Sequence, residues 1–336
     1  MSTPPTTNPA ANSSASPVDD RSQAVDTACQ QGAAAMDPAI TTIQPGGGVV
    51  MSIELAWGKL RRSLLRTFRR GYVRRMRATR QGDRGPLPFD PVDPRDLKYF
   101  QNQPTYWWSP ADDPFRWRDS LPCVRAGLAE LLLIGGGFGL LASLCAWLWW
   151  PAAVVPHVLA GLVVWFFRDP RRDVPAGSGN VVSPADGKLV QIDSVDDPEL
   201  GKCLQIGIFL SIFNVHANRA SLAGRVVAIR YRPGKFLNAL RPESAQENEN
   251  LDLVLEPVDG TKRKYRIRQI TGQFARRIVC WVKPGDLLSH GEMYGMIKLG
   301  SRTELVIPDE PSLEITSKIG DKVAAGTTVL ARYRDE

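Results

Sequence analysis

The sequence of 336 residues has few side chains of the kinds that bind metals or form disulfides. It contains only three histidines, and no second histidine or cysteine accompanies His216 at the spacing of metal ligands, so we expect no metal site. No cleavable signal sequence stands at the amino terminus, and no pair of cysteines has CxxC spacing. The five cysteines are therefore expected to be free thiols of a reducing compartment. They are Cys29, Cys123, Cys145, Cys203 and Cys280.

Residues 1–50 have almost no aromatic or long aliphatic side chains except near the end of the segment. They are rich in Ser, Thr, Ala, Pro, Gly and Gln, and such a composition buries too little apolar surface to offset the entropy of ordering. We expect residues 1–50 to form a disordered tail.

Acidic residues are absent between Lys59 and Arg80, where ten basic residues cluster and supply much of the net charge of +7. Such a cluster fits nucleic acid or anionic lipid, and no nucleic-acid-reading motif accompanies it. Apolar side chains recur every fourth residue, which predicts a basic amphipathic helix on a membrane surface over residues 51–85. A solvated basic linker stays open as an alternative, because Gly71 weakens the helix. The apolar stripe consists of Leu60, Leu64, Phe68, Tyr72 and Met76.

Charged side chains are also nearly absent from residues 126–167, where Glu130 and His157 are the exceptions. This apolar block is too long for one membrane crossing of ~20 residues and suits two. Pro151 and Pro156 lie where a hairpin would turn. Arginines flank both ends, which predicts a hairpin in the cell membrane with the rest of the chain on the cytoplasmic side. A re-entrant hairpin in one leaflet and a buried soluble hairpin stay open.

Two further segments complete the predicted organisation. Residues 86–125 are an aromatic and proline-rich connection, and residues 168–336 are short apolar runs separated by Gly, Pro and Asp. Such runs predict a mainly β domain. Residues 282–292 resemble residues 317–327 at an offset of 35 positions, each copy containing a Gly-Asp turn and a second glycine. This repeat predicts two quasi-equivalent units of a barrel-sandwich-like β domain.

Three short segments of the predicted β domain carry side chains suited to chemistry. They are SPADG at residues 183–187, FNVHANR at 213–219 and LGSR at 299–302. Alone, each is typical of an ordinary turn or strand end. In this order and spacing, with WFFRDP at 165–170 and QENEN at 246–250, the chain from about residue 126 onward resembles phosphatidylserine decarboxylase proenzymes of the short type with a membrane hairpin.

This resemblance implies a self-cleaving enzyme that converts phosphatidylserine to phosphatidylethanolamine. Ser301 would attack the carbonyl of Gly300, the chain would break between them, and Ser301 would become a covalent pyruvoyl (pyruvate) cofactor that forms a Schiff base with the substrate. By similarity, His216 would act as the base and Asp186 would orient it. The two cleaved chains would stay associated.

Two flanking charges and one departure from the family pattern concern the same site. Arg302 and Lys298 are candidates for binding the substrate phosphate or carboxylate. Phe213 stands where longer members of the family carry a second histidine, so any mechanism with two histidines is in doubt.

Other functions fit part of the sequence. A membrane-anchored barrel-sandwich adaptor without activity would share the hairpin and the repeat. A carrier domain with Lys298 as the modified lysine is a further alternative. An archaetidylserine decarboxylase would use the same chemistry on an ether-linked lipid.

Overall fold

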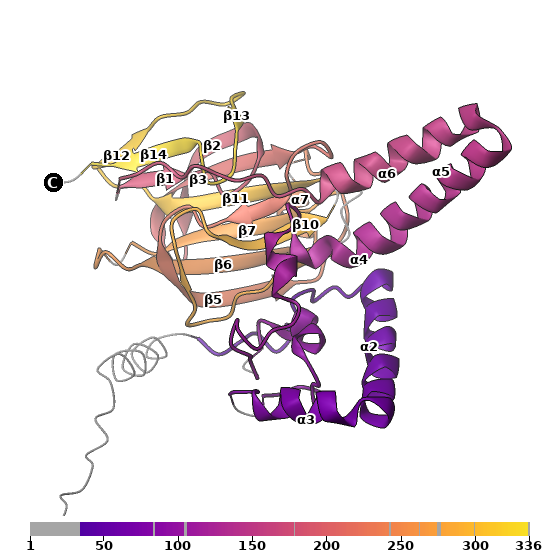
Figure 1. Cartoon of the computed structure of the whole chain (residues 1–336). Helices are drawn as coiled ribbons and strands as arrows, with labels where there is room; N and C mark the ends of the chain where they lie inside the picture. Colours follow the sequence, from indigo (N-terminus) through magenta and orange to yellow (C-terminus); the bar gives the residue numbers. More distant parts are fainter. Residues whose placement is uncertain are drawn as a thin grey trace, which may run out of the picture.

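The computed structural model describes residues 34–82, 85–103, 106–177, 179–241, 243–261, 263–273, 277–298 and 300–334. A β domain, a projecting helical hairpin and two amino-terminal helices make up this part of the chain (Figure 1). Residues 1–33 of the predicted tail lie outside the described residues, whereas the end of the predicted tail packs against the β domain. Ile40 and Ile43 are buried against the β domain, and the amide of Ala34 donates to the carbonyl of Val227 at 2.8 Å. These two isoleucines supply the apolar surface that the preceding residues lack.

The β domain confirms the mainly β prediction. Its largest sheet is an antiparallel, curled sheet of eight strands, and two sheets of three strands accompany it. The large sheet has the order β13 (Lys322–Val323), β2 (Gly187–Asp197), β3 (Gly201–Leu210), β11 (Ser301–Pro308), β7 (Tyr265–Thr271), β6 (Asn250–Pro257), β5 (Gly224–Arg232) and β9 (Leu287–Leu288). The small sheets are β1 (Asn180–Val182), β14 (Val329–Tyr333) and β12 (Leu313–Ile315), and β4 (Ala217–Arg219), β10 (Met293–Lys298) and β8 (Arg277–Cys280).

Alternation along the strands places the core on one face of the large sheet. Leu251, Leu253 and Leu255 of β6 are fully buried in the main apolar cluster, as is Ile267 of β7. The residues between them include Asp252, which accepts two hydrogen bonds from Arg268 at 2.6 and 2.9 Å. The opposite face thus carries ion pairs, and these keep its buried charges compensated.

The internal repeat occupies the two edges of the large sheet, as two quasi-equivalent units. Strand β9 belongs to the first copy and β13 to the second. In each copy an aspartate closes the turn, since Asp286 accepts from the amide of Lys283 at 2.9 Å and Asp321 from that of Lys318 at 3.0 Å. The later glycines, Gly291 and Gly326, approach one another. The repeat therefore brings the two edges of the curled sheet together.

The basic run forms two helices rather than one. Helix α2 (Val49–Phe68) ends where Arg69 leaves helical geometry, and α3 (Arg70–Ala78) follows in a new direction. The predicted apolar stripe is divided accordingly. Leu60, Leu64 and Phe68 of α2 are exposed, whereas Met76 of α3 is buried.

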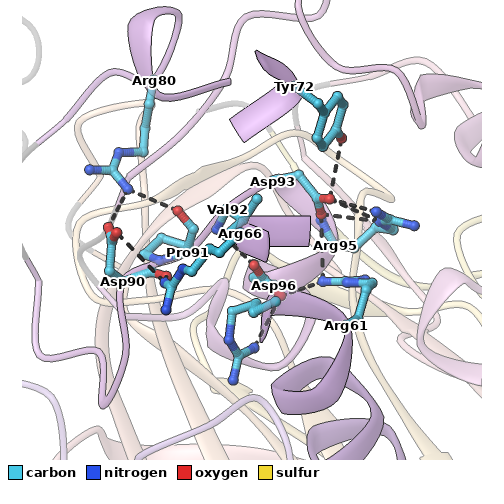
Figure 2. A network of polar contacts seen from close by, with 11 residues as sticks. Arg61, Arg66, Tyr72, Arg80, Asp90, Pro91, Val92, Asp93, Arg95 and Asp96 are labelled. Atoms are coloured by element: carbon cyan, nitrogen blue, oxygen red, sulfur yellow. Dashed lines mark hydrogen bonds and ion pairs between the residues drawn. The ribbon is translucent and has the colours of Figure 1, made fainter. Parts of the chain in front are cut away.

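The arginines of this run have acidic partners in the segment that follows. Asp96 accepts from Arg62 at 3.1 Å and from Arg61, and Asp90 accepts from Arg77 and Arg80 at 2.6 Å each. Figure 2 shows Arg61, Arg80, Asp90 and Asp96 of this network around η1 (Pro94–Phe100). Part of the basic charge is therefore neutralised within the protein.

The apolar block forms a helical hairpin that projects from the β domain (Figure 1). Residues Arg125–Leu148 form a helix long and apolar enough to cross a membrane, and Trp150–Phe166 form a shorter apolar helix. Most of their large apolar side chains are exposed, which indicates membrane association. The elements are η3 (Arg125–Gly127), α4 (Leu128–Glu130), η4 (Leu131–Gly135), α5 (Gly136–Leu148), η5 (Trp150–Ala153) and α6 (Val154–Phe166); η2 (Arg116–Ser120) precedes them and α7 (Ser244–Glu247) lies in the β domain.

Candidate active site at the Gly300-Ser301 bond

Gly300 and Ser301 lie at the connection between β10 and β11. Gly300 has φ +56°, a left-handed conformation that glycine adopts without the steric cost of a side chain. Ser301 begins β11 and is fully buried, and its Oγ has no hydrogen-bond partner among the described residues. A buried hydroxyl without a partner is costly, so its presence beside a left-handed glycine marks this bond as a candidate reaction site.

His216 reaches this bond through strand pairing. It precedes β4, which pairs with β10, and its carbonyl accepts from the amide of Ile297 at 3.2 Å. The imidazole Nε2 accepts from the amide of Gly300 at 3.2 Å, while Nδ1 lies 2.9 Å from the carbonyl oxygen of Asn214. The Asn214 carbonyl can only accept, so the ring carries its hydrogen on Nδ1 and leaves the lone pair of Nε2 toward Gly300.

Burial keeps this imidazole neutral. The ring is fully buried and packs against the ring of Phe166, with centroids 4.5 Å apart. Burial, and to a smaller extent the nearby Arg168, lowers the pKa of His216 from 6.5 to about 4. A neutral imidazole can accept a proton at neutral pH, so the geometry and the charge state suit a general base.

Asp186 does not contact the imidazole. Its carboxylate accepts from Arg172 at 2.9 Å through both oxygens and from the amide of Ala325 at 2.7 Å. These donors occupy the carboxylate. The Asn214 carbonyl accepts from Nδ1, the contact that the family resemblance implied for Asp186. Asp186 instead links Arg172, which precedes the Gly300-Ser301 bond in the chain, to Ala325, which follows the bond.

Lys298 and Arg302 are both buried and paired inside the protein. Lys298 contacts Glu130 of the hairpin and donates to Gln44 at 3.1 Å. Arg302 follows Ser301 on the strand, so its side chain points to the opposite face of the sheet, where it contacts Gln191 and pairs with Glu304 at 2.9 Å. Neither cation is therefore directed at the hydroxyl of Ser301.

A small cavity of about 230 Å³ opens beside Gly300. Its walls come from the end of β3 and the loop after it, from residues 238–240 and from residues 272–273. Ile212 of the wall is exposed, as is its neighbour Phe213. The indole of Trp165 donates to the carbonyl of Phe213 at 3.2 Å, so the end of the hairpin holds one side of the cavity mouth.

Three residues of the site were not among the sequence-based candidates. Asn214 and Phe166 belong to the FNVHANR and WFFRDP segments, so their position in these segments was the available signal. Gly272 carried no such signal. A Cβ atom at Gly272 would lie 2.5 Å from the carbonyl oxygen of Gly300, so this glycine is needed for close approach to the bond.

The other histidines lie elsewhere. Nδ1 of His157 contacts the carbonyl of Ala153 inside the hairpin, and His290 interacts with the backbone of Ser221 and Asn180. Within the described ranges, no group of three or more His, Cys, Asp or Glu side chains could hold a metal ion.

A buried serine hydroxyl, a neutral imidazole and a left-handed glycine at one peptide bond define a site for acyl transfer within the chain. Comparison with known proteins identifies the family. Residues 159–331 match the family model of phosphatidylserine decarboxylase, and the chain therefore belongs to this family.

Curated relatives agree with this assignment. The phosphatidylserine decarboxylase proenzyme of Rhodopirellula baltica is 62% identical over 71% of this chain and 99% of its own length. The proenzyme of Nitratidesulfovibrio vulgaris is 44% identical over 56% of this chain and 85% of its own length. That of Syntrophus aciditrophicus is 38% identical over 66% of this chain and 99% of its own length.

Proposed function

We propose that this chain is a proenzyme that cuts itself between Gly300 and Ser301 and then decarboxylates phosphatidylserine to phosphatidylethanolamine. The observation that carries the proposal is the buried, unpartnered Oγ of Ser301 next to Gly300, whose amide donates to a neutral imidazole, in a chain of the phosphatidylserine decarboxylase family. An adaptor would have no reason to retain a buried hydroxyl without a partner.

Self-cleavage follows from these groups. Oγ of Ser301 attacks the carbonyl carbon of Gly300, His216 accepts the hydroxyl proton, and the proton passes to the departing amide nitrogen of Ser301. The product is an ester between Gly300 and the side chain of Ser301. Loss of the Cα proton of Ser301 then expels the carboxylate of Gly300. The remaining enamine takes up water and releases ammonia, which leaves a pyruvoyl group at the start of the small chain.

Once formed, the pyruvoyl group would supply a ketone that binds the substrate amine. The adjoining carbonyl would accept the electron pair left when carbon dioxide departs. The residues present fit such a group, because Ser301, whose Cα would carry the ketone, is fully buried and follows Gly300, whose amide donates to His216 and which lines the cavity. A dry site protects the ketone and strengthens the pull on developing charge.

The substrate headgroup would enter the cavity beside Gly300. Its volume of about 230 Å³ lies below the ~300–1,000 Å³ of pockets that enclose a whole ligand, so the acyl chains would stay in the bilayer. The exposed Ile212 and Phe213 at its mouth, held by Trp165 of the hairpin, support a location against the membrane surface.

The arginines that flank the hairpin support a cytoplasmic position of the β domain at the cell membrane. The exposed apolar stripe and basic residues of α2 support contact with an anionic lipid surface. Asp186, Lys298 and Arg302 stay predicted site residues. Their internal partners favour roles in positioning the site.

A denaturing gel with intact mass spectrometry tests the proposal. The purified protein should consist of two chains, and the small chain should begin with a pyruvoyl group in place of Ser301. Ser301→Ala should stay whole, and His216→Ala should be cleaved far more slowly. Matched controls are Ser312→Ala and His290→Ala, which should be cleaved as the wild type is.

Two further variants separate the remaining roles. Asp186→Ala should slow cleavage if the carboxylate supports the site, and Arg302→Ala, which leaves the buried Glu304 without this partner, should slow cleavage only through loss of stability. A wild-type protein isolated as one chain with an unmodified serine at position 301 would refute the proposed function.

A further inference from the structure

A second cavity is formed by other residues than the cavity beside the Gly300-Ser301 bond. It has a volume of about 500 Å³, within the ~300–1,000 Å³ of ligand pockets. Its walls come from α2, from η1 and η2, and from the first turns of the membrane helix at Ala129, Leu132 and Leu133. It shares no lining residue with the cavity beside Gly300.

Cations outnumber carboxylates in this cavity. Five cationic side chains line it against the carboxylates of Glu54 and Asp96. Asp93 does not line the cavity but pairs with Arg95 at 2.6 Å, which still leaves an excess of positive charge. The five cations are Arg61, Arg62, Arg95, Lys98 and Arg118.

Four of these cations have carboxylate partners. Arg61 and Arg62 bind Asp96, Arg95 binds Asp93, and Lys98 binds Glu54 at 2.6 Å. Figure 2 shows the contacts of Arg61 and Arg95 from close by. Arg118 is different. Its guanidinium lies 4.8 Å from the centre of the Phe115 ring and makes no ion pair within the described part of the chain.

The surroundings of Arg118 favour an anion. Burial, followed by the neighbouring charges of Arg125 and Arg95, lowers the pKa of Arg118. An anion bound at Arg118 would relieve this repulsion, and a guanidinium matches the geometry of a phosphate. The electrostatics thus agree with the excess of cations on the cavity walls.

The apolar side of the cavity indicates what kind of anion binds. Ile53 and Trp57 of α2 and Leu132 and Leu133 of the membrane helix line it, and all four are exposed. Leu132 and Leu133 lie in the first turns of the helix that can cross a membrane, at the level where headgroups meet acyl chains. A free phosphate would leave these side chains in water, whereas a lipid would cover them.

We propose that this cavity binds one phospholipid of net negative charge, with its phosphate at Arg118 and its first acyl carbons against Trp57 and Leu132. The bound lipid joins α2 to the base of the hairpin. This is a site for a resident lipid, separate from the site of cleavage.

Native mass spectrometry of the full chain in a neutral detergent tests this inference, with phosphatidylglycerol as the probe. This lipid has the negative charge but no amine that a pyruvoyl group could bind. Wild-type protein should retain one phosphatidylglycerol molecule more tightly than phosphatidylcholine. Arg118→Gln should weaken this binding about five- to tenfold, as expected for one half-buried cation that binds phosphate.

Arg116→Gln is the matched control, because Arg116 lies on the same short helix, is exposed and does not line the cavity. It should retain the lipid. An excess of inorganic phosphate should not displace phosphatidylglycerol. Melting followed by circular dichroism verifies that Arg118→Gln is folded.

Equal lipid affinity of the Arg118→Gln and Arg116→Gln proteins would overturn the inference, as would displacement by inorganic phosphate, which would assign the cavity to a free anion. The mass of the small chain in the same samples reports separately on self-cleavage. The inferred lipid site and the proposed function can therefore fail independently.

Discussion

The chemistry at Gly300-Ser301 depends on single side chains whose properties come from burial. His216 has one hydrogen-bond acceptor, the Asn214 carbonyl, at Nδ1 and one donor, the Gly300 amide, at Nε2. Both contacts fit the neutral ring, and the apolar ring of Phe166 disfavours the charged one. The same burial that leaves the hydroxyl of Ser301 without a partner thus keeps the base in its active form.

The pH dependence of self-cleavage should reflect this lowered pKa. An imidazole with a pKa of about 4 is unprotonated at neutral pH and at pH 5, and it becomes protonated only as the pH falls through about 4. The cleavage rate should therefore be nearly constant from about pH 8 to about pH 5 and decrease below that. Protein made by pulse-labelled cell-free synthesis and chased at different pH values measures the rate on gels. An inflection near 6.5 would contradict a buried base.

Gly272 should be as sensitive as the residues that react. A methyl group there would meet the Gly300 carbonyl oxygen at 2.5 Å and would shift the carbonyl that Ser301 attacks. Gly272→Ala should therefore slow cleavage by about tenfold to a hundredfold, the effect of misplacing a reacting group by up to 1 Å. Gly71→Ala is the control, because nothing lies within 4 Å of its added methyl. Equal cleavage rates for the two variants, measured as above, would show that Gly272 does not set the geometry of the bond.

The sequence alone could predict which residues lie at this bond but not their contacts. His216 and Ser301 lie in segments whose order and spacing are specific, and the structure brings both to one bond. The partners of Asp186, Lys298 and Arg302 were not predictable, because Arg172, Glu130 and Glu304 reach them through pairing of distant elements.

At the scale of elements, the hairpin and the β domain meet at a buried ion pair. Glu130 of α4 pairs with Lys298 of β10, two residues before Gly300, and Gln44 accepts from the same amine. The apolar composition of residues 126–167 predicted the hairpin, and the similarity of two segments 35 positions apart predicted the repeat. Neither predicted this contact, because its partners are distant in the sequence, or the break of the helix at Arg69.

Replacing one partner of this ion pair should destabilise the protein more than replacing both partners. Lys298→Met or Glu130→Leu alone leaves a buried charge without its partner and should cost about 3–5 kcal/mol of stability. The double variant removes both charges and should recover most of this loss. Melting temperature in detergent and the half-time of self-cleavage measure the effects. If the double variant were as unstable as the sum of the single variants, the pair would carry no coupling between the hairpin and β10.

At the scale of the whole molecule, the proposed cleavage site would divide the β domain within its largest sheet. The chain after Gly300 contains β11 to β14, and β11 lies in the middle of the large sheet between β3 and β7. Strand β14 pairs with β1, and β13 pairs with β2. The small chain therefore contributes strands to the interior and to one edge of a sheet made mostly by the large chain.

The two chains should consequently stay together after cleavage. Separating them would expose the hydrogen-bonding edges of β3 and β7 and the buried side chains of Leu305 and Ile307. Size-exclusion chromatography in mild detergent should give one peak that contains both chains, at the position of the uncleaved Ser301→Ala protein. In urea, release of the small chain should coincide with unfolding of the large chain, followed by tryptophan fluorescence. Release of the small chain from a large chain that is still folded would contradict an interleaved sheet.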